Sequence, residues 1–262
     1  MAQPFFSNGI RTVYNWLYEW SGQVVRPLRG LALLAALLLL SSCGRYFHGP
    51  LQPTADQSAG MAVNDDGSVT YRFDRLAINL KPMTDAELNR TISGGANPAV
   101  NPYTFGDWSA PGDEWTPPRF TVFRLTVDNY QYPKVKLDPL KTHITTSNNR
   151  LYGPLSYAQL YDYFRSYWQG RIGLGRVEFQ ARTGALRQTL YSGAVVFSGR
   201  DEQGYLVFPL LHDDVGDIEV HIEDIAVRFD FADQPVETVD LTFSFQREVR
   251  QGFTPTSAVR RN

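Results

Sequence analysis

Alternation of apolar and polar residues with a period of two is the feature that most constrains the fold of this chain. Phe120–Asp128 places Phe120, Val122 and Val127 among its apolar positions, and the segment 236–249 alternates in the same way. Such alternation is typical of strands with one face on a core. Further segments of this kind are 68–73, 76–80, 135–145, 193–197, 205–208 and 218–231. About eight strands with short connections predict a mainly β, antiparallel sandwich.

Several strands carry irregularities that can be located from the sequence. In the segment 218–231, Ile222 and Ile225 fall on opposite parities, and a β-bulge at Glu223–Asp224 would put both on one face. The segment 135–145 is expected to be interrupted at Asp138–Pro139. The segment 191–208 predicts a hairpin whose turn is Gly199–Gly204.

A helical insertion is predicted over about residues 155–190. Ser156 and Gln159 match a capping box, and Leu160 and Phe164 follow at helical spacing. The arginine-rich segment 174–190 favours a second helix. An insertion of this length between two strands either caps one end of the sandwich or forms a functional surface.

The segment Gly30–Leu40 is entirely apolar and is followed by Ser41-Ser42-Cys43. A run of about 11 residues is too short to cross a bilayer, which needs roughly 20, but it fits the hydrophobic region of a secretory signal. Arg26 and Arg29 precede it. The tetrad Leu40–Cys43 resembles the lipobox of bacterial lipoprotein precursors. The alternative is an uncleaved anchor or a buried helix with an incidental cysteine.

The resemblance implies that the signal is cut before Cys43 and that this cysteine carries diacylglycerol and an amide-linked acyl chain such as palmitate. Gly44 stands where an inner-membrane retention signal would place aspartate, which implies an outer membrane location facing the periplasm if the organism has one. The partner implied by the motif is therefore the membrane itself, bound through the lipid on Cys43.

The predicted organisation follows from these segments. Residues 1–42 are a signal peptide, or a shorter one if translation starts near residue 24, because the aromatic stretch 15–20 is unusual in such a signal. Residues 43–67 are the lipidated cysteine and a flexible tether, 68–250 the sandwich with its helical insertion, and 251–262 a tail. The sandwich resembles the immunoglobulin-like domains of uncharacterised bacterial lipoproteins. This resemblance rests on Phe123–Val127, the following Asp128-Asn129 and the hairpin.

Composition excludes several classes of protein. The formal net charge is -2, so no basic field favours nucleic acid. The single cysteine excludes a disulfide framework and any zinc site with two or more thiolates. No Gly-x-Ser-x-Gly motif is present and no spacing indicates another catalytic set, so we expect no enzyme and no cofactor.

An acidic loop is the candidate metal site, because carboxylates and imidazole suit Ca²⁺ or a transition metal. Its candidate ligands are His212, Asp213, Asp214 and Asp217. The spacing does not match an EF-hand. The alternative is a polar turn leading into a strand whose exposed face carries Glu219, His221 and Glu223.

Two aromatic regions are candidate interfaces. The proline-rich loop 97–118 contains Trp108 and Trp115, which either contact a partner or cover an open sheet edge. The insertion carries aromatic and basic side chains, which either bind a partner or form a solvated face. The candidates there are Tyr161, Arg165, Trp168 and Arg171.

Together these features predict a membrane-anchored envelope lipoprotein that acts as a non-enzymatic binding or assembly module. Its expected partner is an envelope protein or a glycan. The alternative is a periplasmic protein that binds a metal ion or a small molecule.

Overall fold

The computed structural model describes residues 45–93, 101–106, 108–109, 111–112, 115–169, 175–252 and 259–260, without the side chains of 93, 167–169 and 260. The predicted signal peptide and Cys43 lie outside these residues. The chain divides into two compact units, Met1–Tyr46 with Gln251–Val259 and Phe47–Arg250 with Arg260–Asn262. No helix in the described ranges is both long enough and apolar enough to span a membrane.

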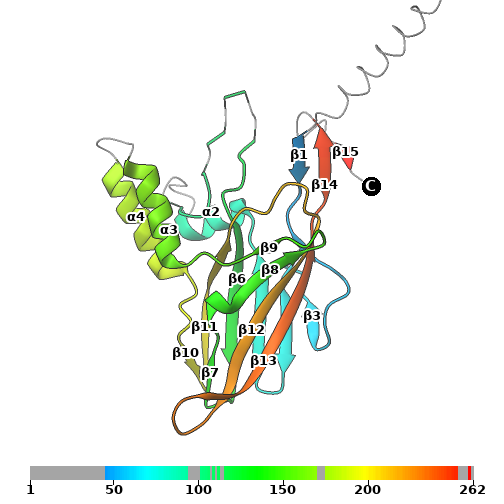
Figure 1. Ribbon diagram of the computed structural model, residues 1–262, viewed down its shortest axis with the longest axis vertical. Helices are drawn as coiled ribbons and strands as arrows, with labels where there is room; N and C mark the ends of the chain where they lie inside the picture. The colour runs from blue at the N-terminus through cyan, green and yellow to red at the C-terminus, as the bar shows by residue number, and fades with distance from the viewer. Residues whose placement is uncertain are drawn as a thin grey trace, which may run out of the picture. The chain divides into compact units, whose positions relative to one another are not determined.

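The larger unit contains two antiparallel sheets (Figure 1). One has the order β11 (Arg200–Phe208), β6 (Thr121–Asn129), β5 (Leu76–Pro82), β4 (Val69–Phe73) and β3 (Met61–Val63). The other has the order β10 (Val195–Phe197), β7 (Lys134–Lys136), β12 (Asp217–Phe229), β13 (Pro235–Gln246) and β2 (Gln52–Pro53). In this second sheet β8 (Thr142–Thr146) pairs with β12, and β9 (Leu151–Tyr152) pairs with β8.

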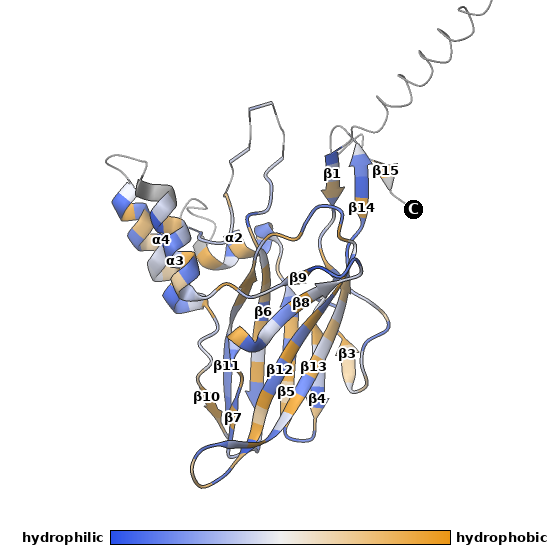
Figure 2. Ribbon diagram, in the orientation of Figure 1, coloured by the Kyte–Doolittle hydropathy of each residue, from blue (hydrophilic) through white to orange (hydrophobic). Residues whose placement is uncertain are grey.

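Apolar side chains of both sheets form one core, which confirms the predicted antiparallel β-sandwich. The ring of Phe123 on β6 lies 6.0 Å from that of Phe208 on β11 and 5.4 Å from that of Phe245 on β13, measured between centroids. The alternation that predicted the strands is visible as alternating colours along β12 and β13 (Figure 2).

The predicted strand irregularities are confirmed. The register of β12 against β13 shifts between Ile222 and Ile225, and both side chains are buried. Asp224 takes up the bulge with a φ of 55°. A 3₁₀ turn, η2 (Pro139–Lys141), separates β7 from β8 at the position where an interruption was expected.

The predicted hairpin over 191–208 is wrong. β10 pairs with β7 and β11 pairs with β6, so the chain passes from one sheet to the other between them. The expected turn residues Arg200–Gly204 are strand residues, opposite Asn129–Leu125 of β6. They are polar because the side chains of this half of β11 are largely exposed, and polarity alone was a poor sign of a turn.

The helical insertion is confirmed as α3 (Tyr157–Gln169) and α4 (Gly175–Thr189). The Ser156 backbone N–H donates to Gln159 Oε1 at 2.9 Å, and the Gln159 N–H donates to Ser156 Oγ at 3.3 Å. The buried side chains of the insertion form a second core with the outer sides of β6 and β11. Its members are Leu88, Tyr103, Val122, Leu160, Phe164, Leu186, Tyr205 and Val207. Much of the insertion therefore covers a sheet.

A third helix, α2 (Asp85–Ser93), was not predicted. It begins with its own capping box, in which the Thr84 N–H donates to Glu87 Oε2 at 3.0 Å and the Glu87 N–H donates to Thr84 Oγ1 at 3.3 Å. This local signal was present in the sequence.

Residues 52–53 and 61–63 of the predicted tether are strands of the sandwich, which therefore begins before the expected residue 68. β2 pairs with β13 and β3 pairs with β4. Gln57 Nε2 donates to the carbonyl oxygen of Ser244 at 2.6 Å. The segment is polar because it forms the edge of each sheet, where the backbone supplies the contacts. β1 (Arg45–His48), β14 (Val249–Gly252) and β15 (Val259–Arg260) form a three-stranded sheet, so part of the predicted tail is also strand.

Candidate functional site

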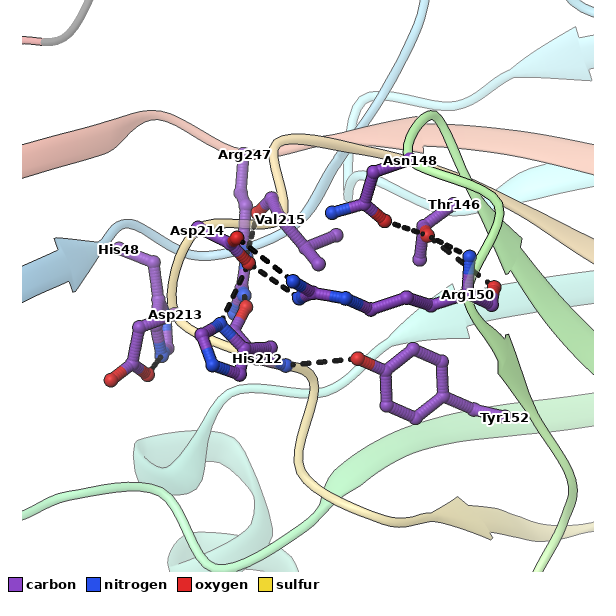
Figure 3. Close-up of polar contacts among 10 residues, drawn as sticks. All are labelled: His48, Thr146, Asn148, Arg150, Tyr152, His212, Asp213, Asp214, Val215 and Arg247. Atoms are coloured by element: carbon purple, nitrogen blue, oxygen red, sulfur yellow. Dashed lines mark hydrogen bonds and ion pairs between the residues drawn. The ribbon is translucent and has the colours of Figure 1, made fainter.

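The predicted metal loop is held by two arginines from other parts of the chain, Arg150 just before β9 and Arg247 just after β13 (Figure 3). Arg150 contacts Asp214 through both ends of its guanidinium group, with Nη1–Oδ1 at 2.6 Å and Nη2–Oδ2 at 3.1 Å. His212 Nδ1 lies 2.7 Å from the same Oδ1. The hydrogen bond from Arg150 lowers the pKa of Asp214, and His212 adds to this effect. The loop is thus closed by a bidentate ion pair.

Arg247, just beyond β13, holds the other side of this loop. Its Nε donates to the carbonyl oxygen of Val215 and its Nη2 to that of His212, both at 2.7 Å. The side chain is only 8% exposed. Burial is the main reason why the pKa of Arg247 falls to about 10.

The four predicted metal ligands do not gather around one point. His212 and Asp214 are in contact, but Asp213 lies 3.8 Å from His48 Nε2, and Asp217 begins β12. Within the described ranges, no group of three or more His, Cys, Asp or Glu side chains is placed to hold a metal ion. Asp214 instead stabilises the conformation of the loop through its contacts with Arg150 and His212.

Two histidines that the sequence did not connect lie face to face on the outer side of the second sheet. His143 on β8 is directly opposite His221 on β12, with ring centroids 4.6 Å apart and planes at 18°. His221 also contacts Thr145 Oγ1 through Nε2 at 2.8 Å and Thr242 Oγ1 through Nδ1 at 3.1 Å. Only strand pairing reveals this contact, because the two residues are far apart in the sequence.

We expect the histidine pair to make the folded protein less stable in mild acid. Burial, followed by the charge of His143, lowers the pKa of His221 below its ordinary value of 6.5. The unfolded chain therefore binds this proton more tightly, so the unfolding free energy falls as the pH drops below about 6.5. His143→Gln should reduce the difference in urea midpoint between about pH 7.5 and about pH 5.5. An unchanged difference would refute the coupling.

The predicted interface residues are partly packed. Trp115 lies edge-on against Phe47, with centroids 5.5 Å apart, and Tyr161 packs against Phe179 at 5.1 Å. Trp108 is 54% exposed. Arg165 is exposed and pairs with Asp162 at 3.1 Å. The side chain of Trp168 and all of Arg171 lie outside the described residues. The structure therefore leaves Trp108 and Arg165 accessible and places Trp115 and Tyr161 in internal contacts.

Exposed apolar side chains gather at one end of the sandwich, in or beside the turns that connect the strands. We call this surface the apolar turn end, and its members are Phe73, Tyr130, Phe197, Phe231 and Val236. The turns contact one another, because the Tyr130 N–H donates to the Arg75 carbonyl at 2.9 Å and Ser198 Oγ donates to the Tyr130 carbonyl at 3.4 Å.

The turn between β12 and β13 belongs to the same end. Lys134, opposite Phe197, forms an ion pair with Asp233 and lies 4.3 Å from the ring centroid of Phe229. Phe231 in this turn is fully exposed. Phe73, Phe197, Phe231 and Val236 are the end residues of alternating segments, so the pattern did not distinguish them from the buried residues of the strands.

No protein-family model matches the chain, and no curated protein sequence is similar to it. Two solved structures give weak similarities. The yjhA protein from Bacillus subtilis has a TM-score of 0.33 and 9% identity, over 66% of this chain and 93% of that one. The secreted protein MPT63 from Mycobacterium tuberculosis has a TM-score of 0.28 and 13% identity, over 62% of this chain and 90% of that one. The assignment of the sandwich rests on the strand pairing described above.

Proposed function

We propose that this protein is a lipid-anchored, non-enzymatic binding module of the cell envelope. The lipobox-like Leu40–Cys43 supports anchoring through Cys43. In an organism with an outer membrane, Gly44 favours that membrane, with the sandwich in the periplasm. The sandwich binds a second envelope component and so connects that component to the membrane.

The observation that carries the binding role is the apolar turn end. Soluble proteins rarely leave large apolar side chains together on the surface unless they mark an interaction site. Phe231 is fully exposed and Phe197 is 59% exposed, although both could have been polar at no cost to the core. Aromatic side chains are also enriched at the centres of protein interfaces.

The position of this end indicates which component it meets. The anchored segment joins the sandwich at Gly49, whose N–H donates to the Glu248 carbonyl at 2.9 Å, just beyond the last residue of β13. The apolar turn end lies at the first residue of the same strand. A strand of 12 residues is about 40 Å long, so the binding surface is remote from the anchored end. This separation favours a partner other than the anchoring membrane.

Photo-cross-linking in cells tests the proposal. A photoreactive amino acid at position 231 or 197 of the full chain should capture one envelope partner in high yield. Position 151 is the control, because Leu151 is an apolar side chain that is 69% exposed and does not belong to the apolar turn end. Phe197→Ser combined with Phe231→Ser should reduce capture at Tyr130 about tenfold while the protein stays folded.

The exposed Trp108 and Arg165 define a second candidate surface, which the same experiment separates from the first. Capture from position 108 or 165, with none from 231 or 197, would overturn the assignment to the apolar turn end and move the interface to the insertion side. Capture of abundant proteins alone, equal at position 151, would overturn the binding role.

A further inference from the structure

A small cavity lies between the first strands, the start of α2 and Arg247. Its volume is about 230 Å³. Most of its wall is apolar and comes from separate parts of the chain. The main apolar contributors are Leu51, Pro82, Met83, Pro118, Phe120 and Leu210. An apolar cavity of about 150 Å³ is known to bind benzene, so this cavity has room for a somewhat larger molecule.

Arg247 is the cation of this cavity. Its guanidinium group is oriented by the carbonyl oxygens of His212 and Val215, and no described residue accepts a hydrogen bond from Nη1. Among the described residues, no carboxylate lies within 4.0 Å of it. The nearby Asp214 is paired with Arg150, and the charge of Asp213 acts on Arg247 only from beyond direct contact. A buried cation without a direct counter-ion is costly, and an anion in the cavity would relieve that cost.

Two other ionisable groups line the cavity, and they restrict the ligand. Burial lowers the pKa of His48, and the charge of Arg247 lowers it further, so His48 is neutral near pH 7. Asp85 opens α2, and burial raises the pKa of its carboxyl group to about 6, against the opposing effect of Arg119. Asp85 is therefore largely ionised near pH 7 and disfavours a second negative charge on the ligand.

We propose that this cavity, the Arg247 pocket, binds a small monocarboxylate with an apolar body. The carboxylate accepts hydrogen bonds from the Arg247 guanidinium group, in the planar arrangement that arginine favours. The apolar body packs against Leu51, Phe120 and Leu210. This site is independent of the apolar turn end and of its partner.

Benzoate is a suitable probe, because it has about the size that the cavity holds and carries a single negative charge at pH 7. Benzamide has the same shape and no charge. We expect the full chain in detergent micelles to bind benzoate saturably with a Kd below about 1 mM in ligand-observed NMR titrations, and benzamide at least about tenfold more weakly. Hexanoate should displace benzoate.

Substitutions of residues that line the Arg247 pocket test whether benzoate binds there, and they leave Arg247 itself unchanged. Leu210→Trp fills the cavity from a side chain that is partly exposed, and it should weaken benzoate binding at least about tenfold. Thr116→Trp fills it from the loop that precedes β6 and should do the same. Leu151→Trp, at an exposed position outside the cavity, is the matched control and should bind like the wild type.

Three results would overturn the proposal. The first is the absence of saturable benzoate binding, and the second is benzamide binding as tight as that of benzoate. The third is unchanged benzoate binding in both folded cavity-filling variants, because the probe would then lie elsewhere on the protein or in the micelle.

Discussion

Gly204→Ala is expected to lower the unfolding free energy by about 3 kcal/mol or more. A Cβ atom at this position of β11 would lie 2.4 Å from Tyr191 Cα, 2.5 Å from Tyr191 N and 2.9 Å from the Leu190 carbonyl carbon. All three are backbone atoms, so no side-chain rotation relieves the overlap. The neighbouring backbone is also held in place, because the Tyr191 N–H donates to the Tyr205 carbonyl at 3.0 Å.

The overlap between an alanine side chain at position 204 and the backbone at Tyr191 would affect both hydrophobic cores. Tyr191 follows α4 and belongs to the sandwich core, and Tyr205 belongs to the second core beneath the insertion. Moving the strand away from Tyr191 therefore disturbs both cores. Urea unfolding followed by tryptophan fluorescence measures the loss.

Gly184→Ala is the matched control for this substitution. A Cβ atom there meets nothing within 4 Å, and the residue lies inside α4, where alanine is favoured over glycine by up to about 1 kcal/mol. The control should be slightly more stable than the wild type. If Gly204→Ala unfolds at the urea concentration of the wild type, the close approach of the two backbones is not as described.

Features encoded by neighbouring residues could be predicted from the sequence. The bulge at Asp224 follows from the change of parity between Ile222 and Ile225, and the start of α3 follows from Ser156 and Gln159, three positions apart. Both depend on local backbone geometry. The capping box of Thr84 and Glu87 belongs to the same class and was missed because the short α2 carries few apolar residues.

Features created by strand pairing could not be predicted in this way. β11 pairs with β6 over nine residues, whereas β10 pairs with β7 over three, and no local pattern in the sequence distinguishes these partners. His143 meets His221 only once β8 has paired with β12. The Arg247 pocket likewise needs residues 48, 85 and 247, which no local pattern connects.

Cys43→Ser is expected to move the protein from the membrane fraction to the soluble fraction and to abolish labelling by radioactive palmitate. A thioether-linked diacylglycerol and an amide-linked acyl chain each contribute about 0.8 kcal/mol for every buried CH₂ group, and two or more chains make attachment effectively permanent. Serine cannot form the thioether, so the whole anchor is lost. Ser41→Ala keeps the cysteine and a small side chain before it, and it is the matched control.

The cell fraction that contains Cys43→Ser distinguishes lipid anchoring from the alternative, an uncleaved apolar helix. If residues 30–40 hold the chain by themselves, Cys43→Ser remains in the membrane after alkaline carbonate washing and the wild type takes up no palmitate. If lipid is the anchor, release of the variant leaves the sandwich itself unchanged, because the Phe47–Arg250 unit contains its own core. The urea midpoint of Cys43→Ser should then equal that of the wild type in detergent, so that localisation and not stability accounts for any loss of cross-linking from position 231.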